Sequence, residues 1–586
     1  MFSKSNVEIA DMLREMGEFL AMQDIPFKPR AYQKAAQIVD ELTDETITER
    51  YAKGGAKALM EVEGIGPGIA GKIEEFLQTG RVKELEGFKK KMPMDLSALS
   101  RVEGLGPKSV QTLYRKLGIT NLKELEAAAK AGKIAKLEGF GKKSEEKILA
   151  NIGFAKTTGE RLALGVALPI ARALEAKLKD APGVAKLIVA GSLRRRKETI
   201  GDIDILATSS KPTAVMERFV KLPEVIHVIA HGETKSSVKL RGGLNVDLRV
   251  VPDASYGAAL NYFTGSKEHN VAIREIAVRK GWKLNEYGLF EGSRRKEKND
   301  SDGKLIAGKT EEEIYKKLGL EYIEPEMREN TGEIEAARQH KLPKIIGYDD
   351  LQGDLQIQTD WTDGSESIET MAKAAQKIGL HYIAITDHTK RLAMTHGLDE
   401  KRIVKQWAEI DRVNKKFGGT FTVLKGTECD ILRDGSLDLP DDILAKLDVV
   451  GVSVHSYFNL PKHEQTERIV RAMSNPHVDI LFHPTGRILN RRPPYELDME
   501  KIIVTAKKTG TILEIDALER LDLKDEHIRL CVEAGIPMAI DSDAHAVAHY
   551  AALECGIAQA RRGWATKNDI INAWPLEKML KFLKKN

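Results

Sequence analysis

Three aspartates on two expected strands are the first candidates for chemistry. Asp202 and Asp204 lie two residues apart in GDIDILATS, and Asp247 lies in NVDLRVV. Because side chains alternate along a strand, Asp202 and Asp204 share one face of a sheet, and we expect Asp247 to join them. Three converging carboxylates require divalent cations, and Mg²⁺ prefers such oxygen ligands. The pattern predicts two-metal nucleotidyl transfer, in which a hydroxyl is activated and a leaving pyrophosphate is stabilised.

A Gly-Ser turn in front of these strands favours a triphosphate ligand. GSLRRRKETIGDID begins with Gly191-Ser192 and runs through Arg194–Lys197 before it reaches Asp202. A DxD pair alone is a weak signal, because strand aspartates are often simply exposed. The third aspartate and the basic turn make the pattern specific, and Ser192 and Arg195 are expected to contact the phosphates.

A glycine-turn pattern occurs three times in the N-terminal part, as VEGIGPGIAGKI (62–73), VEGLGPKSVQTL (102–113) and LEGFGKKSEEKI (137–148). The glycine pairs Gly64–Gly66 and Gly104–Gly106 make tight turns whose backbone N–H groups face outward at the start of a helix. Such a turn holds a nucleic-acid backbone without reading sequence. A single copy would favour a plain helix–helix connection, but three copies on a basic segment favour DNA.

Metal-type side chains follow the apolar strands of the C-terminal part: Asp387-His388, Glu428, His455, His483, and Asp543 with His545. Barrel active sites lie at this end of the strands. A lone histidine is usually a surface or core residue, whereas histidines and carboxylates at five successive strand ends predict a metal centre. Imidazole–carboxylate clusters favour Zn²⁺, Mn²⁺ or Fe.

The elements that must position these residues change along the chain. Residues 1–160 show apolar spacings of three and four, which predict helices. From Lys186 the short runs KLIVAG, DIDILAT, VIHVIAHG, SVKLRG and LNVDLRVVP predict strands of one sheet. After a polar linker at 324–347, the strands HYIAITD, FTVLKG, LDVVGVSV, VDILFHP, TILEID and IPMAIDSD alternate with helical stretches, as in a β/α barrel. The fold class is therefore multidomain α+β and α/β.

Composition excludes several classes of protein. A chain of 586 residues is too long for one small binding module, and no apolar run reaches the length of a membrane helix. The three cysteines have no CxxC spacing, and the N-terminus has no secretory pattern, so we expect a cytoplasmic protein. Residues 1–340 carry 57 Lys and Arg against 50 Asp and Glu, whereas 341–586 carry 34 against 37. The basic excess lies in the half that carries the hairpins, as expected for a DNA-binding surface.

The segments GSLRRRKETIGDID, NVDLRVVP and YFTGSKEHN resemble the nucleotidyltransferase core of family X DNA polymerases, and the likeness covers roughly residues 1–325. It implies that Asp202, Asp204 and Asp247 bind two Mg²⁺, with Asp247 as the base for the primer hydroxyl. The other residues implied in nucleotide binding are Ser192, Arg195 and Gly201 for the phosphates, Tyr262 and Phe263 for the sugar, Gly265 for close backbone approach, Asn270 for the base edge and Arg274 for the template. Lys267 stands where the mammalian enzyme has an acidic residue.

The same resemblance makes residues 1–80 similar to a lyase domain that removes a 5′-deoxyribose phosphate through a lysine Schiff base. Lys72 aligns with the nucleophile, and Tyr32 would line its pocket. We expect the nearby Lys28 and Lys34 to lower the pKa of Lys72, as a nucleophilic amine requires. The alternative is that Lys72 only touches a phosphate beside the first hairpin, and Gly68 replaces a lysine of the family.

The C-terminal part resembles the PHP (polymerase and histidinol phosphatase) domain, a trinuclear phosphoesterase on a distorted (β/α)₇ barrel. The implied ligands are Asp363, His388, Glu428, His455, His483, Asp543 and His545, which would hold two or three Zn²⁺ or Mn²⁺. The first family motif reads His-x-His, but this chain has Gln356 and Gln358. Because carboxamide oxygens are poor substitutes for imidazole at a transition metal, we expect the metal nearest them to bind weakly or not at all.

The resemblance divides the chain into six parts. They are a lyase-like helical domain with the first hairpin (1–80), DNA-binding fingers (81–160), a nucleotidyltransferase palm (161–255), a thumb (256–323), the linker (324–347) and the PHP domain (348–586).

The predicted function is short-gap filling in base excision repair, by a DNA-directed DNA polymerase with a fused PHP domain. The PHP domain would process DNA ends as a 3′–5′ exonuclease or an enzyme of the AP-endonuclease type, impaired by Gln356 and Gln358. The expected partners are gapped or nicked duplex DNA and dNTPs, with no membrane, and the protein is expected to be a monomer. Two alternatives stay open: a DNA-binding scaffold whose carboxylates are idle, and a phosphatase of small phosphate esters tethered to a DNA-binding region.

Overall fold

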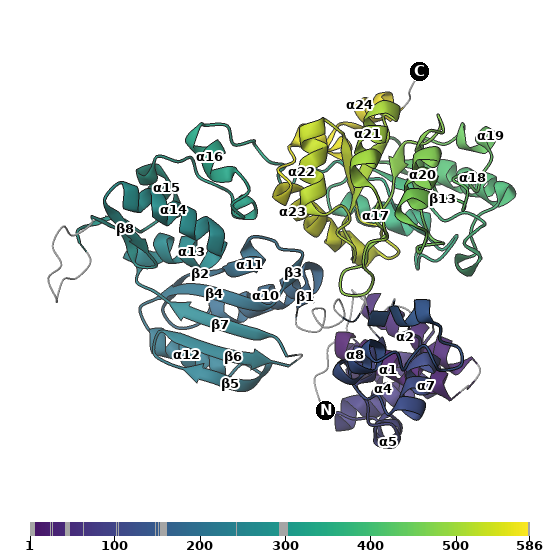
Figure 1. Ribbon diagram of the computed structural model, residues 1–586, viewed down its shortest axis with the longest axis horizontal. Coiled ribbons are helices and arrows are strands. Elements are labelled where there is room, and N and C mark those ends of the chain that lie inside the picture. Colours follow the sequence, from purple (N-terminus) through teal and green to yellow (C-terminus); the bar gives the residue numbers. More distant parts are fainter. Residues whose placement is uncertain are drawn as a thin grey trace. The chain divides into compact units, whose positions relative to one another are not determined.

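The computed structural model of the chain divides into two compact units (Figure 1). It describes residues 6–583 apart from 24, 26, 42–46, 63, 101, 103–104, 147, 150–151, 153–160, 242 and 292–302. Unit 1 comprises residues 1–160 with 490–493 and 546–550, and unit 2 comprises 161–489, 494–545 and 551–586. In the described residues, no helix is both long enough and apolar enough to cross a membrane.

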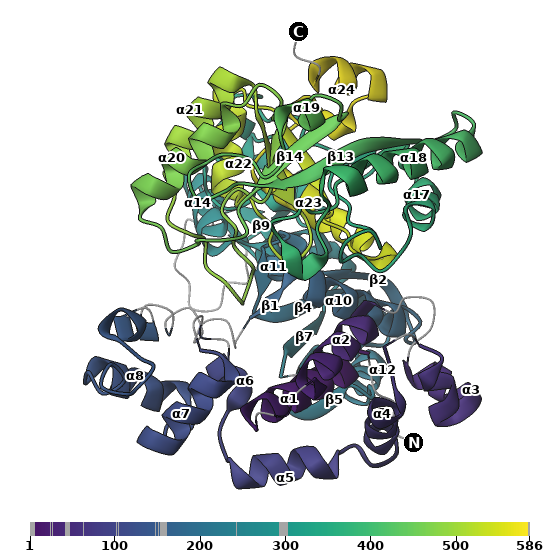
Figure 2. The same ribbon diagram turned by 90° about the vertical axis from the view of Figure 1, so that its right-hand side faces the viewer.

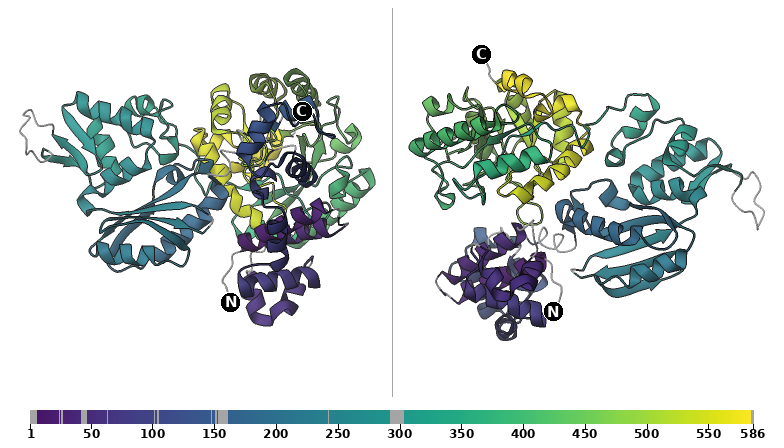
Figure 3. Two further views of the ribbon diagram at one scale, coloured as in Figure 1. Left: turned by 60° about the horizontal axis from the view of Figure 1, so that its bottom comes forward. Right: turned by 180° about the vertical axis from the view of Figure 1, so that it is seen from behind.

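The named elements of residues 1–160 in unit 1 are all helices, as the sequence predicts (Figure 3). They are α1 (Asn6–Met22), α2 (Lys28–Glu41), α3 (Ile47–Met60), α4 (Pro67–Thr79), α5 (Lys83–Lys91), α6 (Leu96–Ser100), α7 (Pro107–Leu117) and α8 (Leu122–Lys130). Helix α1 packs into the core of unit 1 through one apolar stripe. Its residues Ile9, Leu13, Met16 and Leu20 recur at helical spacing and are all buried.

The part of unit 2 predicted as the palm is built on a five-stranded sheet with the order β2-β4-β7-β6-β5. Its elements are β1 (Leu162–Ala163), α10 (Leu164–Lys179), β2 (Val184–Val189), α11 (Gly191–Arg194), β3 (Thr199–Ile200), β4 (Asp202–Ser209), α12 (Pro212–Val220), β5 (Val225–His231), β6 (Lys235–Leu240) and β7 (Asn245–Val250). Strands β4 and β7 are parallel neighbours, and the other pairs are antiparallel. Ile203 and Ile205 of β4 pack with α10 and α12 on one face, which leaves the opposite face for the aspartates.

The thumb follows the palm with η1 (Asp253–Ser255), α13 (Tyr256–Thr264), α14 (Lys267–Arg279), β8 (Trp282–Asn285), β9 (Gly288–Glu291), β10 (Leu305–Ala307) and α15 (Glu311–Leu318). The segment 324–347, predicted as the linker, is packed onto it. It contains η2 (Pro325–Met327) and α16 (Glu333–Arg338), and Arg328 and Glu333 are fully buried. Its polar composition misleads because these charges have partners: Arg328 binds Glu311 at 2.5 Å, and Glu333 binds His269 at 2.7 Å.

The C-terminal part of unit 2 is a nearly closed barrel of seven parallel strands in sequential order, as predicted. The strands are β11 (Gly353–Asp354), β12 (Tyr382–Ile385), β13 (Thr422–Asp430), β14 (Val449–Ser453), β15 (Ile480–Leu481), β16 (Ile512–Asp516) and β17 (Met538–Asp541). A bridge between Ile357 and Ala544 joins the two ends of the sheet.

Helices surround these strands (Figure 2). They are α17 (Ile368–Lys377), α18 (Glu400–Phe417), α19 (Asp441–Leu444), α20 (Lys462–Met473), α21 (Met499–Thr509), α22 (Asp525–Ala534), α23 (Leu553–Arg562) and α24 (Leu576–Leu583), with short turns η3 (Ala393–Thr395), η4 (Val547–Ala552), η5 (Lys567–Asp569) and η6 (Ile571–Ala573). The barrel strands are largely buried on both faces because one face fills the barrel and the other lies under the helices.

Candidate active sites

The three palm aspartates lie on the neighbouring strands β4 and β7. Asp204 is the register partner of Asp247, and Asp202 is exposed one step along the same face. Burial, followed by the charges of Asp202 and Asp247, raises the pKa of Asp204 to about 6. Lys235 reaches Asp247 Oδ2 at 3.2 Å, so part of this negative charge is compensated. The remaining negative charge is what a pair of divalent cations would neutralise, so the donor set fits Mg²⁺.

The Gly191-Ser192 turn lies directly against this carboxylate group. Gly191 has φ +63°, and a Cβ at this position would lie 2.4 Å from Asp204 Oδ2, so only glycine fits. Ser192 follows in α11 beside Asp204. The turn ends at Gly201, where an added Cβ would meet the guanidinium of Arg161 at 2.8 Å. The same turn therefore carries Ser192, Arg195 and Gly201 past the carboxylates.

Arg195 extends from this turn to the end of α13. Its Nη1 donates to the carbonyl oxygen of Thr264, and its Nε lies 3.1 Å from Glu329 Oε1. Gly265, with φ +70°, is the next residue, and an added Cβ there would lie 3.0 Å from Arg195 Nη1. The structure thus brings Arg195 and Gly265 together from segments that are 70 residues apart in the chain.

The remaining predicted nucleotide residues lie around the same end of α13. The rings of Tyr262 and Phe263 meet edge to face at 5.1 Å, and Tyr262 is exposed. Asn270 Nδ2 donates to the Tyr262 carbonyl at 2.7 Å, and Arg274 Nε donates to the Asn270 carbonyl at 3.1 Å. The exposed Tyr262 ring is thus available to a ligand, and the bond from Asn270 holds the backbone beneath it.

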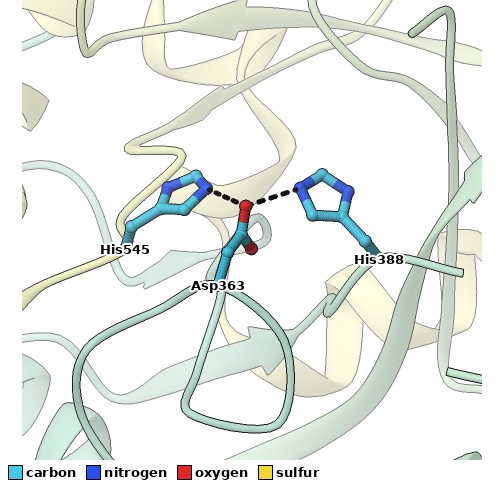
Figure 4. Close-up of side chains that lie close together, drawn as sticks. All are labelled: Asp363, His388 and His545. Carbon is cyan, nitrogen blue, oxygen red and sulfur yellow. Dashed lines mark ion pairs between the residues drawn. The ribbon is translucent and has the colours of Figure 1, made fainter. Parts of the chain in front are cut away.

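Asp363 lies between His388 and His545 at the rim of the barrel, and one carboxylate oxygen faces a ring nitrogen of each histidine (Figure 4). The distances from Asp363 Oδ2 are 3.7 Å to His388 Nε2 and 3.8 Å to His545 Nε2. Asp363 Oδ1 is buried without a hydrogen-bond partner among the described residues. A buried carboxylate oxygen of this kind fits a cation ligand.

Glu428 lies at the centre of a second group. Its Oε1 is 3.1 Å from His455 Nε2 and 2.9 Å from His483 Nε2, and its Oε2 is 3.2 Å from His388 Nδ1. Burial raises the pKa of Glu428, but the charges of His388 and His455 outweigh it and hold the pKa well below its usual range. His388 belongs to both groups, so the donor set fits two neighbouring cations.

The two glutamines do not offer a third cation site. Gln358 Nε2 donates to Glu428 Oε2 at 2.8 Å, and the Gln356 amide nitrogen, turned toward Glu514, donates to Oε1 at 2.5 Å. Both carboxamides therefore act as hydrogen-bond donors to carboxyl groups. The buried Arg520 adds a positive charge, since its Nε lies 2.9 Å from Asp516 and 3.7 Å from Asp543. This guanidinium disfavours a third divalent cation beside Asp516 and Asp543.

Sequence reasoning missed Arg520, Glu514 and Asp516, which lie in and after β16. The sequence does contain a pattern that indicates this carboxylate pair. Glu514 and Asp516 lie two residues apart in TILEID, as Asp202 and Asp204 do in GDID, so they share one face of the strand. Burial, followed by neighbouring carboxylates, raises the pKa values of Glu514 and Asp516 well above the usual range. Asp387, predicted beside His388, is not in either cation group and instead accepts hydrogen bonds from Thr359 and Gln406.

The hairpins of unit 1 repeat one backbone geometry. The amide of Ile65 donates to Val62, that of Leu105 to Val102 and that of Phe140 to Leu137. Gly66 and Gly106 are the N-caps of α4 and α7, and neither makes a side-chain cap, so the first helical N–H groups are left for an anion. Gly64 has φ +87°, and Gly104 lies outside the described residues.

Comparison with known proteins identifies the family of this chain. A DNA polymerase beta thumb model matches residues 259–329, a helix-hairpin-helix domain model matches 4–82, and a SAM-like helix-hairpin-helix tandem model matches 96–152. The DNA polymerase/3′-5′ exonuclease PolX of Bacillus subtilis (strain 168) is 38% identical over 583 residues, which cover 99% of both chains. This chain belongs to the family X DNA polymerases.

The barrel of this family X polymerase has separate relatives. A probable phosphatase of Thermoanaerobacter sp. (strain X514) is 32% identical over 190 residues, which cover 30% of this chain and 72% of the relative. A probable phosphatase of Acetivibrio thermocellus is 29% identical over 191 residues, which cover 30% of this chain and 73% of the relative. These matches fall in the C-terminal part and agree with a PHP-type barrel.

Lys72 of this family X polymerase lies in α4 after the first hairpin. Burial lowers its pKa, but the hydrogen bond and charge of Glu84, whose Oε2 is 2.8 Å from Nζ, outweigh burial and raise it. The prediction that neighbouring lysines lower this pKa is therefore wrong, because a carboxylate is closer to Lys72 than any of them. Tyr32 is buried nearby, and Lys28 is exposed on α2.

Proposed function

We propose that this family X polymerase fills short gaps in duplex DNA with deoxynucleotides during repair, acts as a monomer, and shortens DNA ends from the 3′ side with its barrel. The observation that carries the polymerase part is the register pairing of Asp204 with Asp247 beside the Gly191-Ser192 turn. This arrangement brings oxygen ligands and a phosphate-binding turn to one point, as nucleotidyl transfer requires.

Asp202, Asp204 and Asp247 would hold two Mg²⁺ on the open face of β4 and β7. When bound, these ions lower the pKa of the attacking hydroxyl and neutralise charge on the pyrophosphate. The side chain of Asp247, on β7 and paired in register with Asp204 of β4, accepts the proton from the primer 3′-hydroxyl. Ser192, Arg195 and the backbone at Gly201 hold the triphosphate in line with that hydroxyl.

The end of α13 selects the nucleotide. The exposed Tyr262 and the adjoining Phe263 pack against the sugar and leave little room for a 2′-hydroxyl. Gly265 lets the backbone approach the nucleotide, Asn270 binds the base edge, and Arg274 contacts the template strand. The hydrogen bond from Asn270 to Tyr262 couples base recognition to the position of the sugar pocket.

The uncapped helix starts at Gly66 and Gly106 bind DNA phosphates, with Lys28 adding positive charge. Gly64 lies in the turn of the first hairpin, and Gly104 is the corresponding glycine in the sequence of the second. Contacts to the backbone carry no base information, so binding to a gap does not depend on sequence.

The barrel acts as a phosphodiesterase on DNA ends. Asp363, His388 and His545 would hold one Zn²⁺ or Mn²⁺, and His388, Glu428, His455 and His483 a second, with Asp543 next to His545. Such ions activate a water molecule and polarise the scissile phosphate when bound. His455 Nε2 and His483 Nε2 both lie within 3.1 Å of Glu428 Oε1, so these three ligand groups already converge on one point.

One assay tests both halves. Wild-type protein is incubated with labelled, single-nucleotide-gapped DNA and Mg²⁺ or Mn²⁺, with and without dNTPs. We expect extension only with dNTPs and shortening without them. Asp204→Ala should abolish extension and keep shortening, whereas His455→Ala should do the reverse.

The alternatives give different results in this assay. A scaffold with idle carboxylates would not extend the primer, or would extend it equally after Asp204→Ala. A small-ester phosphatase would release phosphate from a free phosphate monoester without DNA and would not shorten the strand.

A further inference from the structure

The palm turn that carries Ser192 and Arg195 is bound directly by the barrel. Arg196 forms an ion pair with Glu554 at 3.1 Å, and Glu198 with Arg487 at 2.9 Å. An apolar seam lies beside these pairs, where Cys555 and Ala558 of α23 belong to the same buried cluster as the palm core. The barrel therefore holds the turn between the Gly-Ser pair and the catalytic strand β4.

Arg562, at the end of α23, reaches the nucleotide arginine by two routes. Its Nη1 donates to the carbonyl oxygen of Arg195 at 2.9 Å, and the same atom donates to Glu329 Oε1 at 3.0 Å. Glu329 Oε1 also binds Arg195 Nε at 3.1 Å. One barrel guanidinium thus contacts both the backbone of Arg195 and the carboxylate that holds its side chain.

These charges are largely removed from water. The side chain of Arg562 is 2% exposed, that of Arg195 13% and that of Glu329 19%. Asp525 of α22 holds the other end of Arg562 at 2.5 Å. Burial raises the pKa of Glu329, but the charges of Arg562, Arg195 and Lys197 outweigh it and lower the pKa, so the carboxylate is ionised. Buried ion pairs have defined geometry, and loss of one member leaves the others uncompensated.

The direction of the Arg195 guanidinium depends on this network. Its Nη1 is held by Thr264 and its Nε by Glu329, which leaves Nη2 for a ligand. Without Arg562, Glu329 would be compensated by Arg195 and Lys197 alone, and the Arg195 backbone would lose a fixed donor. Both changes would draw the guanidinium out of its present direction.

We propose that Arg562 of the barrel is a positioning residue for the polymerase reaction, which acts through Glu329 and the Arg195 carbonyl to fix Arg195 for the incoming triphosphate. The inference rests on the proposed function, because Arg195 is assigned to the nucleotide phosphates there. It makes the barrel part of the structure that binds dNTPs, separately from any hydrolysis at its own metal centre.

The test is single-nucleotide incorporation on gapped DNA by Arg562→Gln at varied dNTP concentration. We expect KM for the dNTP to rise roughly tenfold, with kcat changed less than about twofold, because ground-state binding of phosphate is what is lost. Arg561→Gln is the matched control. Arg561 is the preceding residue of α23 and binds Glu326 at 2.8 Å without contacting Arg195, so its KM should stay near wild type.

Further variants separate positioning from folding. Arg562→Lys keeps the charge but lacks the planar guanidinium that donates to both Glu329 and the Arg195 carbonyl oxygen. Its KM for the dNTP should therefore lie between those of wild type and Arg562→Gln. The double variant Glu329→Gln/Arg562→Gln should raise KM by a smaller factor than the product of the factors for the two single variants. The exonuclease rate of each variant should match wild type.

Unchanged KM in Arg562→Gln, or an equal rise in Arg561→Gln, would overturn the inference while primer extension still supports the proposed function. A parallel fall in exonuclease rate and kcat would also overturn it, since that indicates general loss of barrel structure. Wild-type protein that fails to extend a primer refutes the proposed polymerase function, and this inference with it.

Discussion

Gln358 donates its amide hydrogen to Glu428 at 2.8 Å, in the place where the family motif has a histidine. The amide therefore occupies a carboxylate oxygen that a metal ion would otherwise use. The described residues form two groups that could each hold a cation, and the Gln358–Glu428 bond and the charge of Arg520 disfavour a third cation beside them.

Restoring histidine at Gln356 and Gln358 should raise metal content and nuclease rate. We expect wild type to retain two Zn²⁺ or Mn²⁺ per chain after dialysis, and Gln356→His with Gln358→His to bind more, because imidazole is the better ligand. Elemental analysis measures the metal, and shortening of labelled DNA measures the rate, expected to rise at least about tenfold. Equal rates in the two proteins would show that the lost histidines do not matter.

The raised pKa of Asp204 predicts a pH dependence of metal binding at the palm. Its pKa is about 6 without metal, so the carboxyl is protonated below that pH, and Mg²⁺ must displace the proton. We expect the Mg²⁺ concentration for half-maximal extension to rise as pH falls from 7 to 5. The stability of the folded, metal-free protein changes in the opposite direction. Because folding raises the pKa of Asp204, this stability falls as pH rises through about 6 and the buried carboxyl group ionises.

Asp204→Asn provides the control for this prediction. At pH 7 the thermal unfolding midpoint of the metal-free wild type should lie below that of metal-free Asp204→Asn. The difference between the two midpoints should be smaller at pH 5. An identical pH dependence in both proteins would contradict the assignment of the titration to Asp204.

Glu84 determines whether Lys72 can act as a nucleophile. Glu84→Gln removes the hydrogen-bonded carboxylate that raises the pKa of Lys72, so more neutral amine is present at pH 7. We expect faster borohydride trapping of the variant on DNA with a 5′-deoxyribose phosphate, and little trapping by wild type. Lys72→Ala in the Glu84→Gln background identifies the trapped residue, and undiminished trapping there would point to another amine.

Gly66 tests the hairpin contact without disturbing the fold. Its φ is −77°, and an added Cβ would meet nothing within 4 Å, so Gly66→Ala should leave the unfolding midpoint unchanged. A methyl group at this helix start would still hinder approach of a phosphate, and affinity for gapped DNA should fall several-fold, to about the same degree on any sequence. Fluorescence anisotropy at fixed salt measures the affinity.

Gly71→Ala is the matched control within the same helix. Gly71 also has open space around an added Cβ, but it lies in α4 beyond the first turn. Equal losses for Gly66→Ala and Gly71→Ala would show that the hairpin turn is not the contact.

Much of the architecture could be predicted from local sequence. The period of two in GDIDILATS placed Asp202 and Asp204 on one face and Ile203 in the core, and this follows from strand geometry alone. The helical N-terminal part was predicted from apolar spacings of three and four, and the barrel from apolar strands that alternate with helical stretches. The packing of the predicted linker 324–347 could not be read from sequence, because composition does not reveal that Arg328 and Glu333 have buried partners.

The sequence by itself determined the types and local order of the chemical groups: the aspartate strands, the glycine hairpins, and the histidines with two glutamines among them. Only the tertiary structure decided which charges lie together. The pKa of Lys72 depends on Glu84, the third cation position on Arg520, and the direction of Arg195 on Arg562, which is 367 residues away. The reason is that alternation and capping act over a few residues, whereas electrostatic effects depend on distance in space and on burial, which long-range packing sets.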